Sequence, residues 1–127
     1  MDVIVVDTSV LIDHLRGHKT ATLRMTQAAE EGHELCASVV SKIELLWNMC
    51  AVEKRRTRTL MRALTWLPLT DTIAEQAGQL ARQYRSSYSN IDLADYVIGA
   101  TAARHDAALW TRNIKHFPMF EGLEAPY

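Results

Sequence analysis

The chain has 127 residues, 48% of them hydrophobic and 23% charged, which is the composition of one ordinary globular domain with a buried core. Its formal net charge is −1, so the chain as a whole does not attract nucleic acid, and a polyanion would have to be held by a local basic patch or by bound metal. No apolar run reaches membrane-spanning length and the acidic start MDVIVVDTSV is unlike a signal peptide, so we expect a single cytoplasmic domain over residues 1–127, without a membrane.

Short β-branched or apolar runs alternate with helical patterns along the whole chain. In chain order the sequence predicts a strand at 2–7, helices at 8–17 and 20–32, a strand at 34–38, helices at 39–52 and 53–64, a strand at 66–70, helices at 70–87 and 91–105, and a strand at 107–111. This alternation favours parallel pairing of the strands, so the expected architecture is an α/β sandwich around a parallel sheet.

The cysteines and histidines form no pattern typical of redox or zinc chemistry. Cys36 and Cys50 lie among apolar neighbours without a C-x-x-C motif, which favours two buried free thiols over a disulfide. His14 and His18 are separated by Gly17 and have no evident third ligand, so a zinc site is not favoured. The chain also lacks the G-x-S-x-G, Walker and G-x-G-x-x-G motifs of the commonest hydrolases and nucleotide-binding proteins.

For two acids, Asp7 and Glu44, a functional and a structural role are both open. Asp7 ends the first predicted strand, where functional sites of parallel sheets gather, but Asp7 or Thr8 could equally cap the helix that follows. Glu44 lies among apolar residues of a predicted helix, but Ser41 three positions earlier completes a capping-box pattern with it.

Asp92 and Asp95 lie three residues apart near the start of a helix that is otherwise almost wholly apolar. Ser89 and Asp92 form an S-x-x-D pattern, so Asp92 has a capping role available. If Ser89 caps the helix, Asp95 is too deep to satisfy free backbone N–H groups, and a charge there needs a partner. Gly99, one turn further on, leaves room beside Asp95. Asp95 is therefore the acid that is hardest to explain as structural.

Asp7, Glu44 and Asp95 come from three separate α/β segments and would repel one another if the sheet brought them together. A divalent cation resolves that repulsion, and oxygen ligands select Mg²⁺ or Mn²⁺ over zinc. Asn113, after the last strand, could add a carbonyl ligand or orient a water, and Thr111 could do so with its hydroxyl. By itself, Asn113 is better explained as a turn residue after a strand.

A basic run in the middle of the chain allows three interpretations. It could contact RNA phosphates, it could receive an acidic partner, or it could be an ordinary solvated helix face. Its charged residues are Lys54, Arg55, Arg56, Arg58 and Arg62.

Three segments, VIVVDTSVLID, SVVSKIELLWN and LADYVIGATAARHDAALWTRNIKHFPMFEGL, resemble PIN domains of the VapC type. The match covers nearly the whole chain, and its C-terminal motif is the most specific. The resemblance implies a three-layer α/β/α sandwich with a mainly parallel central sheet. It also implies an Mg²⁺- or Mn²⁺-dependent endoribonuclease that is commonly a homodimer and is neutralised by a cognate VapB-like antitoxin.

Carried over by motif, the family's three acids fall on Asp7, Glu44 and Asp95, and its Asp-or-Asn position falls on Asn113. Asparagine is neutral, which favours one firmly bound ion over two. Asp92 lies outside the core of the motif and is either an auxiliary metal ligand or only a helix cap.

We therefore predict a toxin that hydrolyses RNA phosphodiester bonds, with Asp7, Glu44, Asp95 and Asp92 as metal ligands and with Asn113 and Thr111 shaping the site. The alternative is a PIN fold that binds RNA or protein without cutting, against which the intact set of acids argues. A phosphatase with Asp7 as nucleophile is disfavoured, because the common haloacid-dehalogenase pattern has a second Asp where this chain has Ser9.

Overall fold

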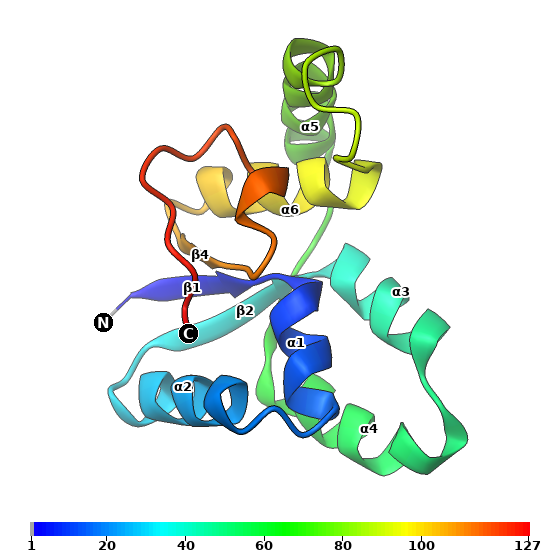
Figure 1. Ribbon diagram of the computed structural model, residues 1–127, viewed down its shortest axis with the longest axis vertical. Helices are drawn as coiled ribbons and strands as arrows, with labels where there is room; N and C mark the ends of the chain where they lie inside the picture. Colours follow the sequence, from blue (N-terminus) through cyan, green and yellow to red (C-terminus); the bar gives the residue numbers. More distant parts are fainter. Residues whose placement is uncertain (1) are drawn as a thin grey trace.

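The computed structural model describes residues 2–127, in which four strands form one sheet and helices follow nearly every strand (Figure 1). In chain order the elements are β1 (Val3–Val6), α1 (Thr8–Leu15), α2 (Lys19–Glu30), β2 (Glu34–Ser38), α3 (Val39–Asn48), the 3₁₀ turn η1 (Ala51–Glu53), α4 (Lys54–Ala63), β3 (Thr65–Leu67), α5 (Asp71–Tyr84), α6 (Leu93–Arg104), β4 (Ala108–Trp110) and the 3₁₀ turn η2 (Ile114–His116).

The sheet has the strand order β3-β2-β1-β4, and all three pairings are parallel. Central β1 carries the apolar run Val-Ile-Val-Val, and Val5 and Val6 are completely buried on opposite faces. Such a strand needs cover on both sides, which helices supply. The parallel sheet that the sequence predicts is therefore confirmed.

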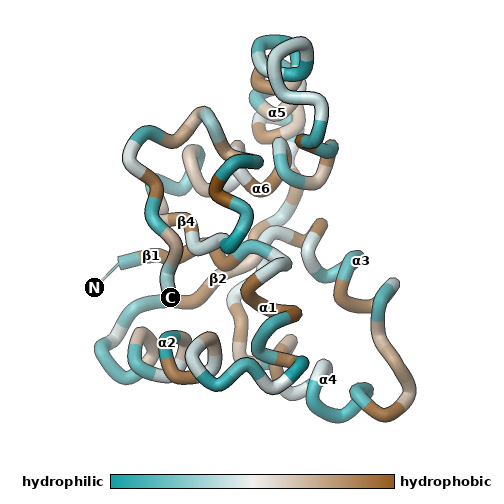
Figure 2. Tube along the Cα trace, in the orientation of Figure 1, coloured by the Kyte–Doolittle hydropathy of each residue, from teal (hydrophilic) through white to brown (hydrophobic). Residues whose placement is uncertain are grey.

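Helices cover both faces of the sheet in three layers (Figure 1). Val6 packs with Leu11 of α1, Met25 of α2 and Leu60 of α4 in one apolar cluster. Val5 faces the other way, toward a second cluster that includes residues of α6, and α5 lies against α6. The α/β/α sandwich implied by the resemblance is confirmed. Figure 2 shows brown apolar residues concentrated along the central strands, whereas the helices alternate between teal and brown.

The carboxyl ends of β1 and β4 meet at one edge of the sheet. The Asp7 amide, just after β1, donates to the carbonyl of Trp110 at the end of β4 over 2.8 Å. Helix α3 starts directly after β2 and packs against both α1 and α6. This edge therefore gathers the starts of α1 and α3, the loop after β4 and the start of α6.

Helix α3 is shorter than the sequence predicts. It ends at Asn48 rather than continuing to residue 52, so Cys50 lies in the loop that follows and is exposed. The prediction of a buried Cys50 is wrong, whereas Cys36 is a free, buried thiol on β2, as expected. None of the helices in residues 2–127 combines the length and the apolar character that crossing a bilayer requires.

Candidate metal centre

Asp7 is buried at the edge of the sheet, with 2% of its surface exposed, and its side chain does not cap α1. Its Oδ2 instead accepts hydrogen bonds from the hydroxyls of Ser9 (2.7 Å) and Thr111 (2.8 Å). Within residues 2–127, Oδ1 accepts no hydrogen bond. The fold thus fixes one oxygen of a buried carboxylate and leaves the other available for a ligand, which argues against the capping interpretation.

Glu44 on α3 is also held by a hydroxyl. Thr8 Oγ1 donates to Glu44 Oε1 over 2.7 Å and lies 2.8 Å from Ser41 Oγ. Helix α3 is capped by Ser38, whose hydroxyl accepts from the amide of Val40, so Ser41 is not the cap. The capping box that the sequence allows for Ser41 and Glu44 is not formed, and Glu44 is directed to Thr8 at the start of α1 instead.

Asp92 and Asp95 cap helix α6 together. Asp92 is the N-cap: its Oδ1 accepts from the amide of Asp95 (3.0 Å), and Asp95 Oδ2 accepts in return from the amide of Asp92 (3.2 Å). The expectation that Asp95 lies too deep to cap is wrong, because the helix begins at Leu93 rather than near Ser89. Asp92 does cap the helix, although as the N-cap itself rather than as the partner of Ser89, and Asp95 has a structural role as well.

Asp95 has a histidine partner that the sequence did not indicate. His116 Nδ1, in η2, lies 3.0 Å from Asp95 Oδ2. The signal for this residue was its place in the motif TRN…HF, three positions after Asn113, but a contact between distant segments cannot be read from spacing. Asp95 Oδ2 therefore faces both the start of its own helix and the loop after β4.

The loop after β4 is tied to Asp7 through Thr111. Thr111 is completely buried, donates to Asp7 and accepts a hydrogen bond from the amide of Asn113 over 2.9 Å. The amide of Arg112 donates to Ser9 Oγ over 3.1 Å. Thr111 therefore positions Asp7 and the loop, while the Asn113 side chain is exposed and makes no hydrogen bond within residues 2–127.

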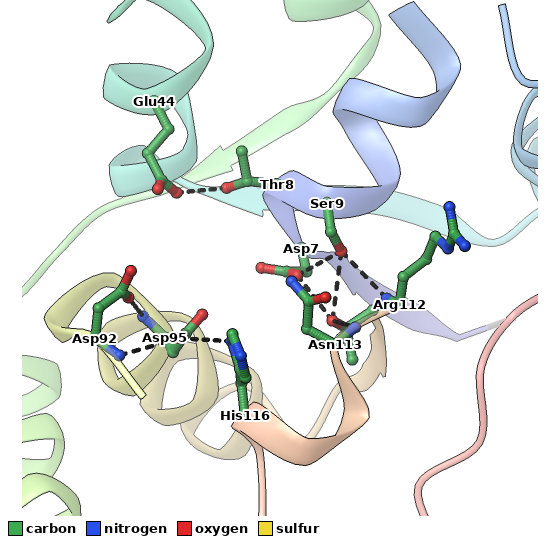
Figure 3. A network of polar contacts seen from close by, with 10 residues as sticks. Asp7, Thr8, Ser9, Glu44, Asp92, Asp95, Arg112, Asn113 and His116 are labelled. Atoms are coloured by element: carbon green, nitrogen blue, oxygen red, sulfur yellow. Dashed lines mark hydrogen bonds and ion pairs between the residues drawn. The ribbon is translucent and has the colours of Figure 1, made fainter. Parts of the chain in front are cut away.

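The charges of the acids act on one another. Burial raises the pKa of Asp95 to about 7; its hydrogen bond with the Asp92 backbone and the charge of His116 oppose the shift, and the charges of Asp92 and Asp7 add to it. Burial likewise raises the pKa of Glu44, against the hydrogen bond from Thr8 and with the charges of Asp92 and Asp7. Figure 3 shows these four side chains facing one region between α1, α3 and α6. We call Asp7, Glu44, Asp92 and Asp95 the acid cluster.

The acid cluster fits a hard divalent cation by its chemistry. It offers carboxylate oxygens, the donors that Mg²⁺ and Mn²⁺ prefer, and two of its pKa values are raised in part by neighbouring negative charge. As they stand, no three His, Cys, Asp or Glu side chains of residues 2–127 are gathered tightly enough to hold an ion. The fit therefore rests on the donor set and its unbalanced charge. His14 and His18, in contrast, bond to Thr22 and to the start of α2.

A three-layer sandwich with acids collected at the carboxyl edge of a parallel sheet defines a class of α/β domains, and comparison with known proteins identifies the class. The PIN domain model matches residues 4–118, so the chain belongs to the PIN-domain family. It is 41% identical over 122 residues to "Ribonuclease VapC19" of Mycobacterium tuberculosis, covering 96% of this chain and 98% of that protein. It is 44% identical over 124 residues to "Ribonuclease VapC10" of the same organism, covering 98% and 92%.

Solved structures show the same fold. A toxin–antitoxin complex from Klebsiella pneumoniae contains a chain with 28% identity and a TM-score of 0.78, with 98% of each chain covered. VapBC2 from Rickettsia felis, bound to a DNA fragment from its promoter, contains a chain with a TM-score of 0.81 at 16% identity, with 97% of this chain and 96% of that chain covered.

Proposed function

We propose that this protein is a metal-dependent endoribonuclease and the toxin of a toxin–antitoxin pair, acting in the cytoplasm as a single domain over residues 1–127. The observation that carries this proposal is the buried carboxylate of Asp7, with one oxygen fixed by two hydroxyls and the other left without a hydrogen bond, beside Glu44 and Asp95. The names of the relatives, ribonucleases VapC19 and VapC10, support the same activity.

In this proposal Asp7, Glu44 and Asp95 hold Mg²⁺ or Mn²⁺, with Asp92 as an auxiliary ligand that also caps α6. When bound, such an ion supplies positive charge that offsets the charge developing on a phosphodiester during hydrolysis. Ser9 and Thr111 keep Asp7 oriented, and Thr8 does so for Glu44. Asn113, which lines two cavities beside Asp7, would contact the substrate or a water.

The cation and the proton of Asp95 should compete. Burial and neighbouring charges raise the pKa of Asp95 to about 7, so near neutral pH a large share of this carboxyl is protonated without a cation. A carboxylate ligand must be ionised, so cation binding should release that proton and should tighten as the pH rises through 7.

The direct test is purified protein incubated with total RNA, with and without divalent metal, followed by mapping of the cut ends. We expect clear cleavage with Mg²⁺ or Mn²⁺ and little with Zn²⁺, because the acid cluster contains only oxygen donors. Cleavage that persists undiminished after thorough chelation would rule out the metal-dependent mechanism. RNA binding without cleavage under any metal would instead favour the non-catalytic PIN module, and a covalent aspartyl-phosphate would revive the phosphatase.

We propose that a VapB-like antitoxin binds beside the basic run on α4. A cavity of about 440 Å³ lies between α2 and α4, with apolar Met25, Leu35 and Leu60 and the cations Arg55 and Arg56 in its lining. An amphipathic segment with acidic residues complements such a groove. The names of the structural neighbours, which are toxin–antitoxin complexes, support this partner.

We further propose a homodimer. Exposed apolar side chains follow the outer face of α3 into η1, with Trp47 85% and Val52 92% exposed. Exposed large apolar side chains gathered on neighbouring elements are typical of an interaction surface. Sedimentation across micromolar concentrations should give the mass of two chains. A strictly monomeric species over that range would contradict the proposal.

A further inference from the structure

A small cavity beside the acid cluster has a lining whose only charged members are basic. Its volume is about 310 Å³, and it is lined by Asn90, Arg112, Asn113, Ile114, Lys115 and His116. We call it the Lys115 cavity. His116, which forms its wall, also contacts Asp95, so the cavity opens directly beside the acid cluster. A polyanion crossing the site would therefore meet positive charge at this point.

A second cavity adjoins the first. Its volume is about 290 Å³, and it shares Arg112 and Asn113 with the Lys115 cavity. Ser9 lines this second cavity and donates to Asp7. Both cavities therefore have a wall residue bonded to the acid cluster, and the segment Arg112–Asn113 separates them. Together they form two adjoining compartments along the site, which suits a chain molecule better than a compact ligand.

Arg112 and Lys115 differ in whether an acidic side chain of the protein already pairs with their charge. Arg112 Nη1 lies 2.9 Å from Asp13 Oδ2, and its guanidinium stands over the ring of Tyr127 at 5.9 Å. The Tyr127 hydroxyl donates to the same Asp13 oxygen over 2.6 Å, which fixes the arrangement. Lys115 is exposed and has neither an ion pair nor a hydrogen bond within residues 2–127. Lys115 is therefore the cation of its cavity that remains available to an outside anion.

We propose that the Lys115 cavity is a subsite for single-stranded RNA, in which Lys115 contacts the phosphate next to the bond that is cut. This inference rests on the proposed ribonuclease function and adds the residue that places the strand. The cavity is at the small end of the range for ligand pockets, roughly 300 Å³, which fits one nucleotide unit and not a duplex. The amides of Asn90 and Asn113 suit the polar edge of a base, and Ile114 offers an apolar wall.

The test is binding of a short single-stranded oligoribonucleotide in EDTA, where nothing is cut, across a series of salt concentrations. Lys115→Gln should weaken binding about threefold to tenfold. It should also make the negative slope of the logarithm of the association constant against the logarithm of the salt concentration shallower by about 0.7, the value for one phosphate contact on a single strand. The matched control is Lys19→Gln, because Lys19 is an exposed lysine at the start of α2 that lines neither compartment.

A contact is separated from a general charge effect by replacing one RNA linkage at a time with a neutral methylphosphonate. At one position the neutral linkage should weaken binding to the wild type but not to Lys115→Gln, because the two changes remove the same interaction. The subsite would be overturned if the losses of RNA affinity from the neutral linkage and from Lys115→Gln were additive at every position. It would also be overturned if Lys115→Gln and Lys19→Gln bound RNA equally well, or if the wild type bound no RNA measurably. The proposal would also be overturned if Lys115→Gln weakened binding of polyglutamate but not of RNA. That result would assign the cavity to an acidic peptide instead.

The same variants separate this subsite from the proposed activity. Lys115-dependent RNA binding by a protein that does not cleave RNA under any divalent metal would keep the subsite and defeat the proposed ribonuclease. RNA cleavage by Lys115→Gln with the KM of the wild type would keep the ribonuclease and defeat the subsite.

Discussion

Asp7→Asn is expected to lower the rate of RNA cleavage by at least about two orders of magnitude, because it removes a charge that the cation needs while preserving shape. The amide oxygen can still accept hydrogen bonds from Ser9 and Thr111, which hold Oδ2 in the wild type. The fold should therefore survive. The measurement is the single-turnover cleavage rate of one mapped RNA, accompanied by a melting curve to show that the variant is folded.

Asp71→Asn is the matched control, because Asp71 is an exposed acid in the first turn of α5 and lies outside the acid cluster. It should cut RNA at the wild-type rate. In cells, expression of the wild type without a partner should arrest growth, and Asp7→Asn should relieve the arrest. A folded Asp7→Asn protein that remains as toxic as the wild type would defeat the ribonuclease explanation of toxicity.

Asp95→Asn should also abolish cleavage, by at least about two orders of magnitude, for the same loss of charge. In metal-free buffer, in contrast, Asp95→Asn should raise the stability of the folded protein. The Asp95 side chain is only 11% exposed and its charge is opposed by burial and by Asp92 and Asp7, so a neutral amide removes an unfavourable charge. The amide oxygen can still accept from the Asp92 backbone, so the capping box survives in part. We expect a melting temperature higher by about 2–5 °C.

The gain in stability should depend on pH. Asp95 binds its proton more tightly in the folded protein, where burial raises the pKa from 3.8 to about 7. Its contribution to stability is therefore complete below pH 3.8 and is lost as the pH rises through 7. Asp95→Asn lacks this loss, so the difference in melting temperature should be larger at pH 8 than at pH 5. Addition of Mn²⁺ should stabilise the wild type and leave Asp95→Asn almost unchanged.

Asp92→Asn is the comparison that separates the two acids of the capping box. Asparagine is as good an N-cap as aspartate, so only the interaction of the charge with the helix dipole is lost, at about 0.5–1 kcal/mol of stability. Cleavage should fall less than in Asp95→Asn. If Asp92→Asn abolished cleavage while Asp95→Asn remained active, the third acid of the site would be Asp92 and not Asp95.

The strands and the acids at their ends could be predicted because their signals are local. The run before Asp7 is apolar on every residue, which identifies a strand buried on both faces, and an acid at its carboxyl end falls at the edge where sites collect. The parallel sheet followed from alternation of elements alone. The family motifs then selected Glu44 and Asp95 from the other acids of the chain.

The starts of the helices were predicted to within two residues, but the residues that cap them were not, and the errors at the site come from this. The segment before α6 contains several residues able to cap, and both Ser89-x-x-Asp92 and Asp92-x-x-Asp95 match a capping box. The structure uses the second, because α6 begins at Leu93. At α3 the sequence offered Ser41 as a capping residue, but the helix is capped by Ser38.

Contacts between distant segments carried no sequence signal. The pairing of His116 with Asp95 depends on how η2 packs against α6. The hydroxyls of Thr8 and Thr111 reach Glu44 and Asp7 only because α1 packs against α3 and β1 pairs with β4. The exposure of Cys50 likewise depends on where α3 stops, which its apolar neighbours did not reveal.

The most direct test of a cation held by the acid cluster is a Mn²⁺ titration of the wild type, Asp7→Asn and Asp71→Asn, with bound metal measured by electron paramagnetic resonance. The predicted result is saturable binding to the wild type that tightens as the pH rises through 7, persists in Asp71→Asn and is lost or greatly weakened in Asp7→Asn. Equal Mn²⁺ affinity in the wild type and Asp7→Asn would contradict the assignment of the acid cluster as the metal site.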